Sequence, residues 1–344
     1  MAADATPPIT DLPTIDLAAL DAGDPAELRA LRTATHGIGF FYLVGHGDEA
    51  TADAADELIA AAREFFALPE SRKRVIENVR SPHFRGYTTL GGERTQGRVD
   101  WREQLDIGAE RAATPPDPQR PWRVLDGPNL WPAEVPRLRR AALDWMAGAG
   151  AVGMRLLRAW AVSLGAPAGH FDAAFADPDP LLKIVRYPGR DGAASGQGVG
   201  GHKDVGALTL LYPEPGTSGL QVEADGRWID APPRRGSFIV NIGELLEVAT
   251  DGYLKATNHK VLPPSEGNDR ISLPFFLNPG FDQALPPVAL EPALAADARG
   301  VGQDSHGGRL HAVYGLNALK SRLRAHPDVA RRYHRDLLEL PELR

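Results

Sequence analysis

The spacing of apolar residues changes along this chain near residue 181. Before that point, Leu58, Ile59, Ala62, Phe65 and Phe66 recur at the spacing of one helix face. Beyond it, short runs rich in Val, Ile, Leu, Tyr and Phe alternate with turn residues, a pattern typical of strands. The chain is therefore expected to have a helical or mixed N-terminal region followed by a β core.

The first 180 residues are expected to hold two strands and three helices. Asp24, Pro25 and Glu27 form a helix-start signal, with a capping side chain, a proline in the first turn and an acid close behind. Residues 80–98 and 114–136 are rich in turn-forming residues and show little periodicity, so both are expected to be loops. The predicted strands span residues 13–17 and 40–44, and the predicted helices span 24–37, 49–68 and 137–164.

The later runs predict a small barrel or jelly roll. They cover residues 181–187, 207–212, 220–222, 227–229, 238–242 and 271–277, with a hairpin signal at Asp225 and Gly226. Helices are expected after Asn317 and from Pro327. The chain thus divides into a helical or mixed region (1–135), a supporting helix (136–180), a β core (181–280) and a C-terminal helical cover (281–344).

Composition narrows the chemistry that this chain can carry. It has 344 residues, of which 43% are apolar, enough to bury a core. The net charge of −7 argues against nucleic acid and anionic membranes as partners, so a small molecule is the expected partner. Cysteine is absent, which excludes disulfides, thiolate metal ligands and cysteine nucleophiles. Any metal must be held by His and carboxylate side chains.

The N-terminal residues give no targeting signal. Residues 1–12 contain no basic segment followed by an apolar one, and no later window is as long as a membrane span. We therefore expect a cytoplasmic protein.

A metal site of His and carboxylate ligands has a weak signature in sequence. A facial triad of two His and one carboxylate takes a His and an acid from one face of a rigid element and a second His from elsewhere. Ten His and 45 acidic residues in 344 positions give about 1.3 His-x-acid matches by chance. The chain contains five such pairs: His46/Asp48, His170/Asp172, His202/Asp204, His326/Asp328 and His334/Asp336.

Strand geometry separates these pairs, because residues i and i+2 point the same way on a strand and diverge on a helix. The pairs at 326 and 334 are expected at the start and in the interior of the final helix, and the pair at 170 at another helix start. The pair at 46 lies in a Gly-flanked turn. His202 and Asp204 are left as the pair that enters the β core.

A second His and an anion-binding pair are expected further along. His259 is the candidate for the second His inside the core. Arg270 and Ser272 are two positions apart at the start of a strand and face one way. Unless it lies at a solvent-exposed strand end, an Arg in an apolar strand needs an anion, and a ligand carboxylate bound by Arg270 and Ser272 would supply it.

These residues resemble the iron(II)/2-oxoglutarate oxygenase superfamily, in its isopenicillin N synthase-like branch. The matching text is ordered along most of the chain. It covers residues 12–17, 37–47, 186–188, 201–211, 219–222, 238–243, 258–259 and 270–276.

The resemblance implies a mainly β fold with flanking helices, whose core is a distorted double-stranded β-helix. It implies iron(II) bound by His202, Asp204 and His259, and 2-oxoglutarate bound at its distal carboxylate by Arg270, Ser272 and Tyr187. The implied reaction uses O₂ and couples decarboxylation of 2-oxoglutarate to hydroxylation, desaturation or cyclisation of a small substrate, in secondary metabolism.

Two alternatives stay open from the sequence. Residues 184–188 and 272–276 look like isopenicillin N synthase itself, an oxidase that needs no 2-oxoglutarate and uses the equivalent Arg, Ser and Tyr for its peptide substrate. A non-enzymatic protein with a metal-binding β-helix is the other alternative.

The sequence gives a weaker signal for the residues that contact the organic substrate than for the metal ligands. In the resembling family, the region around residues 80–98 borders the mouth of the pocket, so Arg85 or Tyr87 is expected to contact an acidic or polar substrate. A solvated loop is the alternative. Phe276 is expected to line the cavity, although aromatic residues on a strand are often plain core.

Overall fold

Two facing β-sheets form the centre of the protein, whose computed structural model describes residues 10–190, 196–301 and 310–343. In spatial order, the larger sheet contains β1 (Thr14–Asp16), β2 (Phe40–Val44), β12 (Phe238–Ile242), β9 (Leu208–Pro213), β14 (Arg270–Leu277), β7 (Leu181–Tyr187), β6 (Glu103–Gly108) and β3 (Gly86–Thr88). The smaller sheet contains β11 (Arg227–Asp230), β10 (Leu220–Ala224), β13 (His259–Val261) and β8 (Val199–His202). A separate hairpin pairs β4 (Arg94–Thr95) with β5 (Arg98–Val99).

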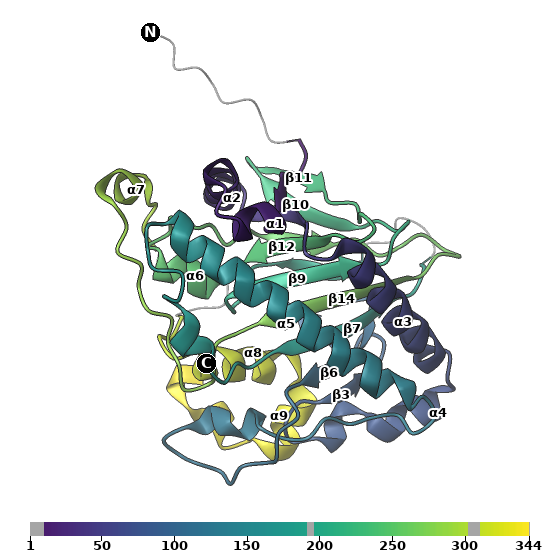
Figure 1. Ribbon diagram of the computed structural model, residues 1–344. Helices are drawn as coiled ribbons and strands as arrows, with labels where there is room; N and C mark the ends of the chain where they lie inside the picture. The colour runs from purple at the N-terminus through teal and green to yellow at the C-terminus, as the bar shows by residue number, and fades with distance from the viewer. Residues whose placement is uncertain (1–9, 191–195, 302–309, 344) are drawn as a thin grey trace.

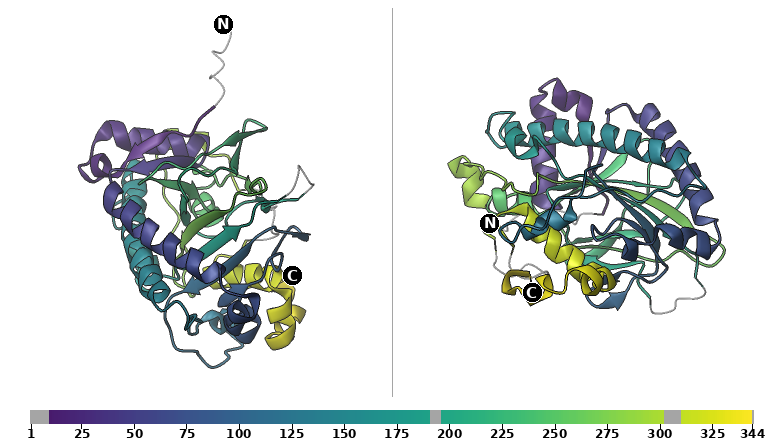
Figure 2. Two further views of the ribbon diagram at one scale, coloured as in Figure 1. Left: turned by 90° about the vertical axis from the view of Figure 1, so that its right-hand side faces the viewer. Right: turned by 90° about the horizontal axis from the view of Figure 1, so that it is seen from below.

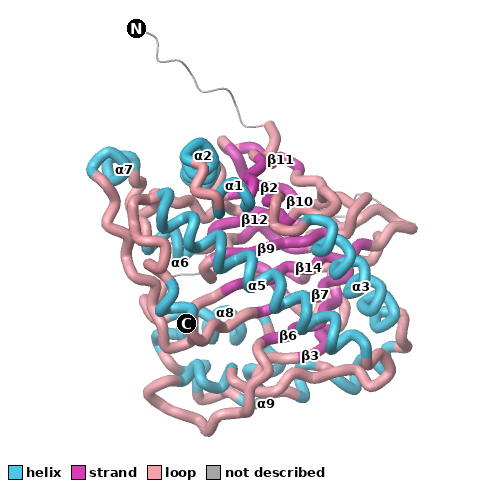
Figure 3. Tube along the Cα trace, in the orientation of Figure 1, coloured by secondary structure: helices cyan, strands magenta, loops and turns pink. Residues whose placement is uncertain are grey.

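Helices cover the outer face of the larger sheet. The long helix α5 (Arg137–Ser163) crosses it diagonally, with α3 (Asp48–Phe66) alongside (Figures 1 and 3). Gly153 allows α5 to approach closely, because a Cβ there would lie 2.7 Å from Leu277 Cδ2. The helix α2 (Pro25–Gly37) also packs on α5 and begins where the sequence predicts, with the Asp24 carboxylate accepting from two backbone N–H groups.

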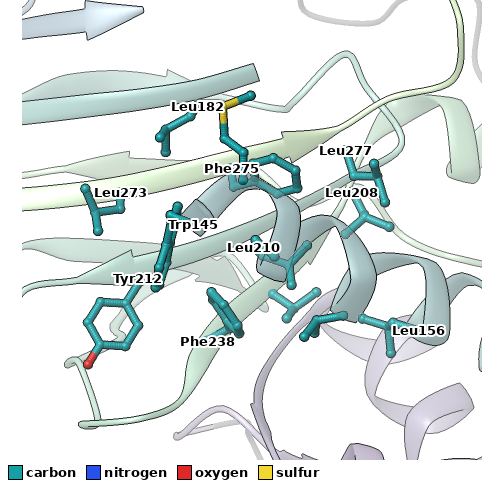
Figure 4. Close-up of a cluster of buried hydrophobic side chains, with 14 of the residues drawn as sticks. Trp145, Leu156, Leu182, Leu208, Leu210, Tyr212, Phe238, Leu273, Phe275 and Leu277 are labelled. Carbon is teal, nitrogen blue, oxygen red and sulfur yellow. The ribbon is translucent and has the colours of Figure 1, made fainter. Parts of the chain in front are cut away.

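The two central strands, β9 and β14, separate an apolar core from a cavity. Both β9 and β14 direct alternate side chains to opposite faces, as strand geometry requires. The face toward α5 is apolar and contains Leu208, Leu210, Tyr212, Leu273, Phe275 and Leu277 (Figure 4). Ile271 belongs to the same apolar cluster. The opposite face lines a cavity with Thr209, Leu211, Pro213, Arg270, Ser272, Pro274 and Phe276.

The C-terminal helices close the lower end of the molecule. The helices α8 (Tyr314–Ala325) and α9 (Pro327–Tyr333) pack on segments from the first 135 residues, as Figure 2 shows. Phe84, Trp122 and Leu319 belong to the apolar cluster at this contact. The remaining α-helices of the described residues are α1 (Leu17–Asp21), α4 (Glu70–Lys73), α6 (Glu244–Ala249) and α7 (Pro292–Asp297).

The fold confirms the expected mainly β architecture with flanking helices, and the facing sheets fit a double-stranded β-helix. The strands expected at 40–44, 181–187 and 238–242 are present with those bounds. The sheet is not confined to residues 181–280, because β1, β2, β3 and β6 come from the first 135 residues.

Some local expectations were wrong. Residues 80–98 contain β3 and β4 rather than only loop, and β6 was not predicted. In β6, Glu103 and Asp106 are buried among Lys73, Arg186 and Arg322, so ion pairs replace the apolar pattern on which the prediction relied. The pair His334/Asp336 lies just beyond α9 and not inside a helix, because the helix ends at Tyr333.

The helices give no candidate for a membrane span. Within the described ranges, none is both long enough and apolar enough to cross a bilayer.

The core packing predicts the effect of a truncation on stability. Leu210→Ala removes a fully buried side chain beneath α5 and should lower the free energy of unfolding by about 2–5 kcal/mol. The matched variant Leu338→Ala, at a site that is 37% exposed, should change it by no more than about 0.5 kcal/mol. Urea denaturation measures both, and equal losses would contradict this packing.

Candidate metal and co-substrate site

A cavity of about 360 Å³ lies between the two sheets. Its walls come from β7, β9 and β14 of the larger sheet, β8 and β13 of the smaller one, and α8 at the lower end. The cavity combines apolar positions such as Phe276 and Leu181 with convergent polar groups, as ligand sites commonly do.

Three of these polar groups lie within reach of one ion. His202 is the last residue of β8 and pairs directly with His259, the first residue of β13. The Asp204 Oδ1 atom lies 3.6 Å from His202 Nε2 and 3.8 Å from His259 Nε2. One ligand atom from each residue lies within 4.8 Å of the others, so the structure brings the predicted set together.

Backbone carbonyls orient both imidazoles. His202 Nδ1 lies 2.8 Å from Gly200 O, and His259 Nδ1 lies 3.1 Å from Thr257 O. Because a carbonyl only accepts, each Nδ1 must carry the proton, and each Nε2 presents a lone pair to the space beside Asp204. This is the tautomer that a divalent metal requires.

The carboxylate of Asp204 is held in the same way. Its Oδ2 accepts hydrogen bonds from Thr209 Oγ1 at 2.5 Å and from Asn241 Nδ2 at 2.8 Å. Oδ1, which faces the two imidazoles, is left free to bind a metal.

The site electrostatics favour a metal-ready protonation state. Burial, together with repulsion from His259, lowers the pKa of His202 to about 4 despite the attraction of Asp204. Burial alone would raise the pKa of Asp204, but His259, His202, Asn241 and Thr209 outweigh it and lower that pKa. Near neutral pH, Asp204 is therefore ionised and His202 neutral, as metal binding requires.

An anion-binding group lies in the same cavity. Arg270 is 2% exposed, and its guanidinium carbon lies 4.4 Å from the centre of the Tyr187 ring, directly across the β7–β14 pair. Nη1 donates to Ser218 O at 2.5 Å, while the buried Nε has no hydrogen-bond partner in the described chain. Burial lowers the pKa of Arg270, and Ser272 lies beside it on the cavity face. A carboxylate would satisfy the donors that remain.

Of the three residues expected to contact the substrate, Arg85 and Phe276 line the cavity and Tyr87 does not. Arg85 lines the cavity with its guanidinium packed on Gly108, where a Cβ would lie 2.1 Å from Cζ. Its Nη2 lies 4.0 Å from Asp179 Oδ1, and its buried Nε has no partner among the described residues. Burial lowers the pKa of Arg85. Phe276 also lines the cavity.

Tyr87 lies elsewhere. Its side chain is fully buried, and its hydroxyl donates to Glu103 Oε2 at 2.5 Å. It is absent from the described residues that line the cavity. The expectation that Tyr87 contacts the substrate was therefore wrong, because its hydroxyl is buried against Glu103.

Three residues of the site were missed in the sequence. Asn241 is the lone polar residue in the buried strand Phe238–Ile242, a signal that could have identified it. Thr209 gave no such signal, because Thr is common in strands. Glu244 also lines the cavity, and burial raises its pKa to about 7 despite Lys203.

The hydrogen bonds to Asp204 predict how metal binding responds to mutation. Thr209→Val removes one donor from Oδ2, so the pKa of Asp204 should rise and iron(II) affinity should fall by about 10- to 100-fold. Because protons compete for the same carboxylate, the variant should lose metal at a higher pH than the wild type. Anaerobic iron(II) titrations across pH measure this, with Thr217→Val, whose hydroxyl caps a distant turn, as control. Unchanged affinity would show that the Thr209 hydroxyl does not support Asp204.

Comparisons with known proteins agree with this geometry. Residues 12–134 match the family described as non-haem dioxygenase in morphine synthesis N-terminal, and residues 178–279 match the 2OG-Fe(II) oxygenase superfamily. The 2-oxoglutarate-dependent dioxygenase frbJ of Dothideomycetidae sp. (strain 11243) is 34% identical, over 95% of this chain and 91% of its own. A homoarginine-6-hydroxylase of Arabidopsis thaliana is 30% identical, over 80% of this chain and 87% of its own.

A solved structure extends the comparison to three dimensions. A full-length Neurospora crassa protein in complex with alpha-KG and thymine has a TM-score of 0.69 and 25% identity, covering 86% of this chain and 93% of that one. The resemblance seen in the sequence is thus confirmed by relatives that match most of its length. This chain belongs to the 2OG-Fe(II) oxygenase superfamily of non-haem dioxygenases.

Proposed function

We propose that this protein is a cytoplasmic dioxygenase of secondary metabolism that uses iron(II), 2-oxoglutarate and O₂ to oxidise a small organic molecule, not a nucleic acid. The observation that carries the proposal is a single cavity that holds both a His, Asp, His cluster and a buried arginine with an unpaired donor. The first suits a divalent metal and the second a carboxylate.

The donor set fits iron(II). His202, Asp204 and His259 would hold the metal through Nε2, Oδ1 and Nε2, and three protein ligands leave positions open for small molecules. When bound, iron(II) with 2-oxoglutarate and O₂ supplies the oxidation of a substrate C–H bond, with succinate and CO₂ as co-products. Thr209, Asn241 and the carbonyls of Gly200 and Thr257 keep the ligands aligned.

The co-substrate would be bound by residues of β14 and β7 that line the cavity. Arg270 is proposed to hold its distal carboxylate, with Ser272 adding a hydrogen bond and Tyr187 packing against the guanidinium. The apolar side chains of Leu211, Leu220 and Val261 also line the cavity and would limit access of water to the bound molecule.

The organic substrate would contact Arg85 and Phe276. The Arg85 guanidinium lies 4.0 Å from the Asp179 carboxylate, and its buried Nε has no partner among the described residues. It can therefore donate hydrogen bonds to an anionic group of the substrate. Phe276 provides an apolar surface between this arginine and Thr209, which holds Asp204.

Removal of Arg270 tests the co-substrate. In Arg270→Ala, affinity for 2-oxoglutarate should fall by at least about 30-fold, since a buried charge pair is lost. Iron(II) with 2-oxoglutarate and no O₂ should give a visible charge-transfer band in the wild type, and titration of that band measures the affinity. Arg234→Ala is the matched control, because Arg234 stacks on Tyr42 at 3.6 Å on the surface. Absence of the band in the wild type would refute the proposed function, whereas a band of equal strength in Arg270→Ala would remove Arg270 from it.

Replacement of Arg85 tests the substrate side. Arg85→Gln should raise the KM for the organic substrate by about 10-fold or more, through loss of an ionic contact, and leave the KM for 2-oxoglutarate unchanged. Arg111→Gln is the control, since Arg111 lies 3.9 Å from the same Asp179 carboxylate but is not among the cavity-lining residues described. Steady-state kinetics measure both, and equal effects of the two variants would contradict substrate contact by Arg85.

A further inference from the structure

One acid of the cavity lacks the partners that the others have. Four acidic residues line the cavity in the described ranges: Glu93, Asp179, Asp204 and Glu244. Glu93 is paired with Arg102 and Lys183, Asp179 faces Arg85 and Arg111, and Asp204 accepts two hydrogen bonds. The Glu244 carboxylate has no hydrogen bond or ion pair within the described chain, although Glu244 is only 4% exposed.

Backbone contacts hold Glu244 beside the metal ligands. Its N–H donates to Asp204 O at 2.8 Å, and the neighbouring Leu245 N–H donates to Gly206 O at 3.1 Å. Gly243 permits this approach, because a Cβ there would lie 2.1 Å from Gly206 O. Lys203 does not neutralise Glu244, since its ammonium pairs with Glu247 at 3.1 Å. These contacts place Glu244 at the metal end of the cavity, where it forms part of the lining.

A buried carboxylate without a partner is costly for the folded protein. Glu244 is the first residue of the six-residue helix α6, and acids are common at helix N-termini because they interact favourably with the helix dipole. That interaction would account for an exposed acid. It offsets little of the free-energy cost of burying this carboxylate. A ligand that brings a positive charge into the cavity would offset it.

We propose that Glu244 binds a cationic nitrogen group of the substrate, a protonated amine or a guanidinium, next to the metal. This inference rests on the proposed function and names the substrate class of the same site. With Arg85 at the other end, the substrate is a molecule that carries both a positive and a negative group, such as a basic amino acid.

The sheet sets the direction along which the two charges are separated. One row of paired residues runs across five strands, from Asn241 through Thr209, Phe276 and Leu181 to Gly108. Asn241 holds Asp204 at one end, and Arg85 packs on Gly108 at the other. The row spans four strand spacings, roughly 19 Å between its end Cα atoms. Phe276 and Leu181 give the space between the charges an apolar floor.

This arrangement also predicts where oxidation occurs. Because Glu244 adjoins Asp204 while Arg85 lies at the far end of the row, the cationic end of the substrate is held near the metal. The carbon oxidised is therefore close to the cationic nitrogen and remote from the carboxylate.

Binding measurements test the proposal without turnover. L-Arginine and L-lysine are titrated calorimetrically into the wild type loaded with iron(II) and 2-oxoglutarate under argon. L-Citrulline and L-norleucine, which keep the α-ammonium and α-carboxylate but have neutral side chains, are titrated in parallel. The basic members should bind at least about 10-fold more tightly, and Glu244→Gln should abolish that preference. Asp251→Asn, which changes an exposed acid just past α6 and outside the cavity lining described, should keep it.

Two further measurements separate the possible failures. Glu244→Asp keeps the charge and should keep a preference for the basic probes, so a loss in Glu244→Gln is not a folding defect. The anaerobic charge-transfer band reports the proposed function before any probe is added, and it should form in the wild type and in all three variants.

The outcomes that overturn the inference are distinct. Equal affinity for basic and neutral probes, no binding of any basic probe, or a preference that survives Glu244→Gln overturns it while the proposed function stands. Oxidation next to the carboxylate, found by mass spectrometry of the products, overturns the assigned orientation. A wild type that forms no band overturns the proposed function and this inference with it.

Discussion

The direct pairing of His202 with His259 across β8 and β13 is the constraint on which the rest of the site depends. It brings two residues that are distant in sequence to one point with both Nε2 atoms facing Asp204. Their Nδ1 atoms are bound to backbone carbonyls, so the rings cannot turn without losing hydrogen bonds. A shift of one residue in this register would turn the side chains to the other face of the sheet and dismantle the cluster.

The larger sheet makes stability and function compatible by assigning them to opposite faces. The face under α5 is apolar, and its packing supplies the hydrophobic contribution to folding. The face toward the smaller sheet lines the cavity, in which Arg85, Glu244 and Arg270 keep capacity for charged ligands. Buried charged groups without a partner lower the stability of the ligand-free protein. The packing of the apolar core on the other face offsets this loss of stability.

The ionic residues along the lower wall serve a different purpose. Glu93, Asp106, Arg102, Lys183 and Arg322 are paired among themselves. Asp106 on β6 contacts Arg322 on α8, so this network attaches the C-terminal cover to the sheet. Asp100 also pairs with Arg102, so three acids face three bases in this network. Because these charges are balanced, we assign ligand recognition to Arg85 and Glu244 instead.

The sequence by itself determined the β core, the long helix and the His, Asp, His set, because alternating apolar positions and a His-x-Asp pair leading into a strand are local patterns. The tertiary structure decided which further polar residues share the cavity. Tyr87 was expected there but is buried against Glu103, and Glu244 was not expected but lies beside Asp204. The physical reason is that burial and ion pairing depend on strands that meet from distant parts of the chain, as β6 and β7 do, and no local period records those meetings.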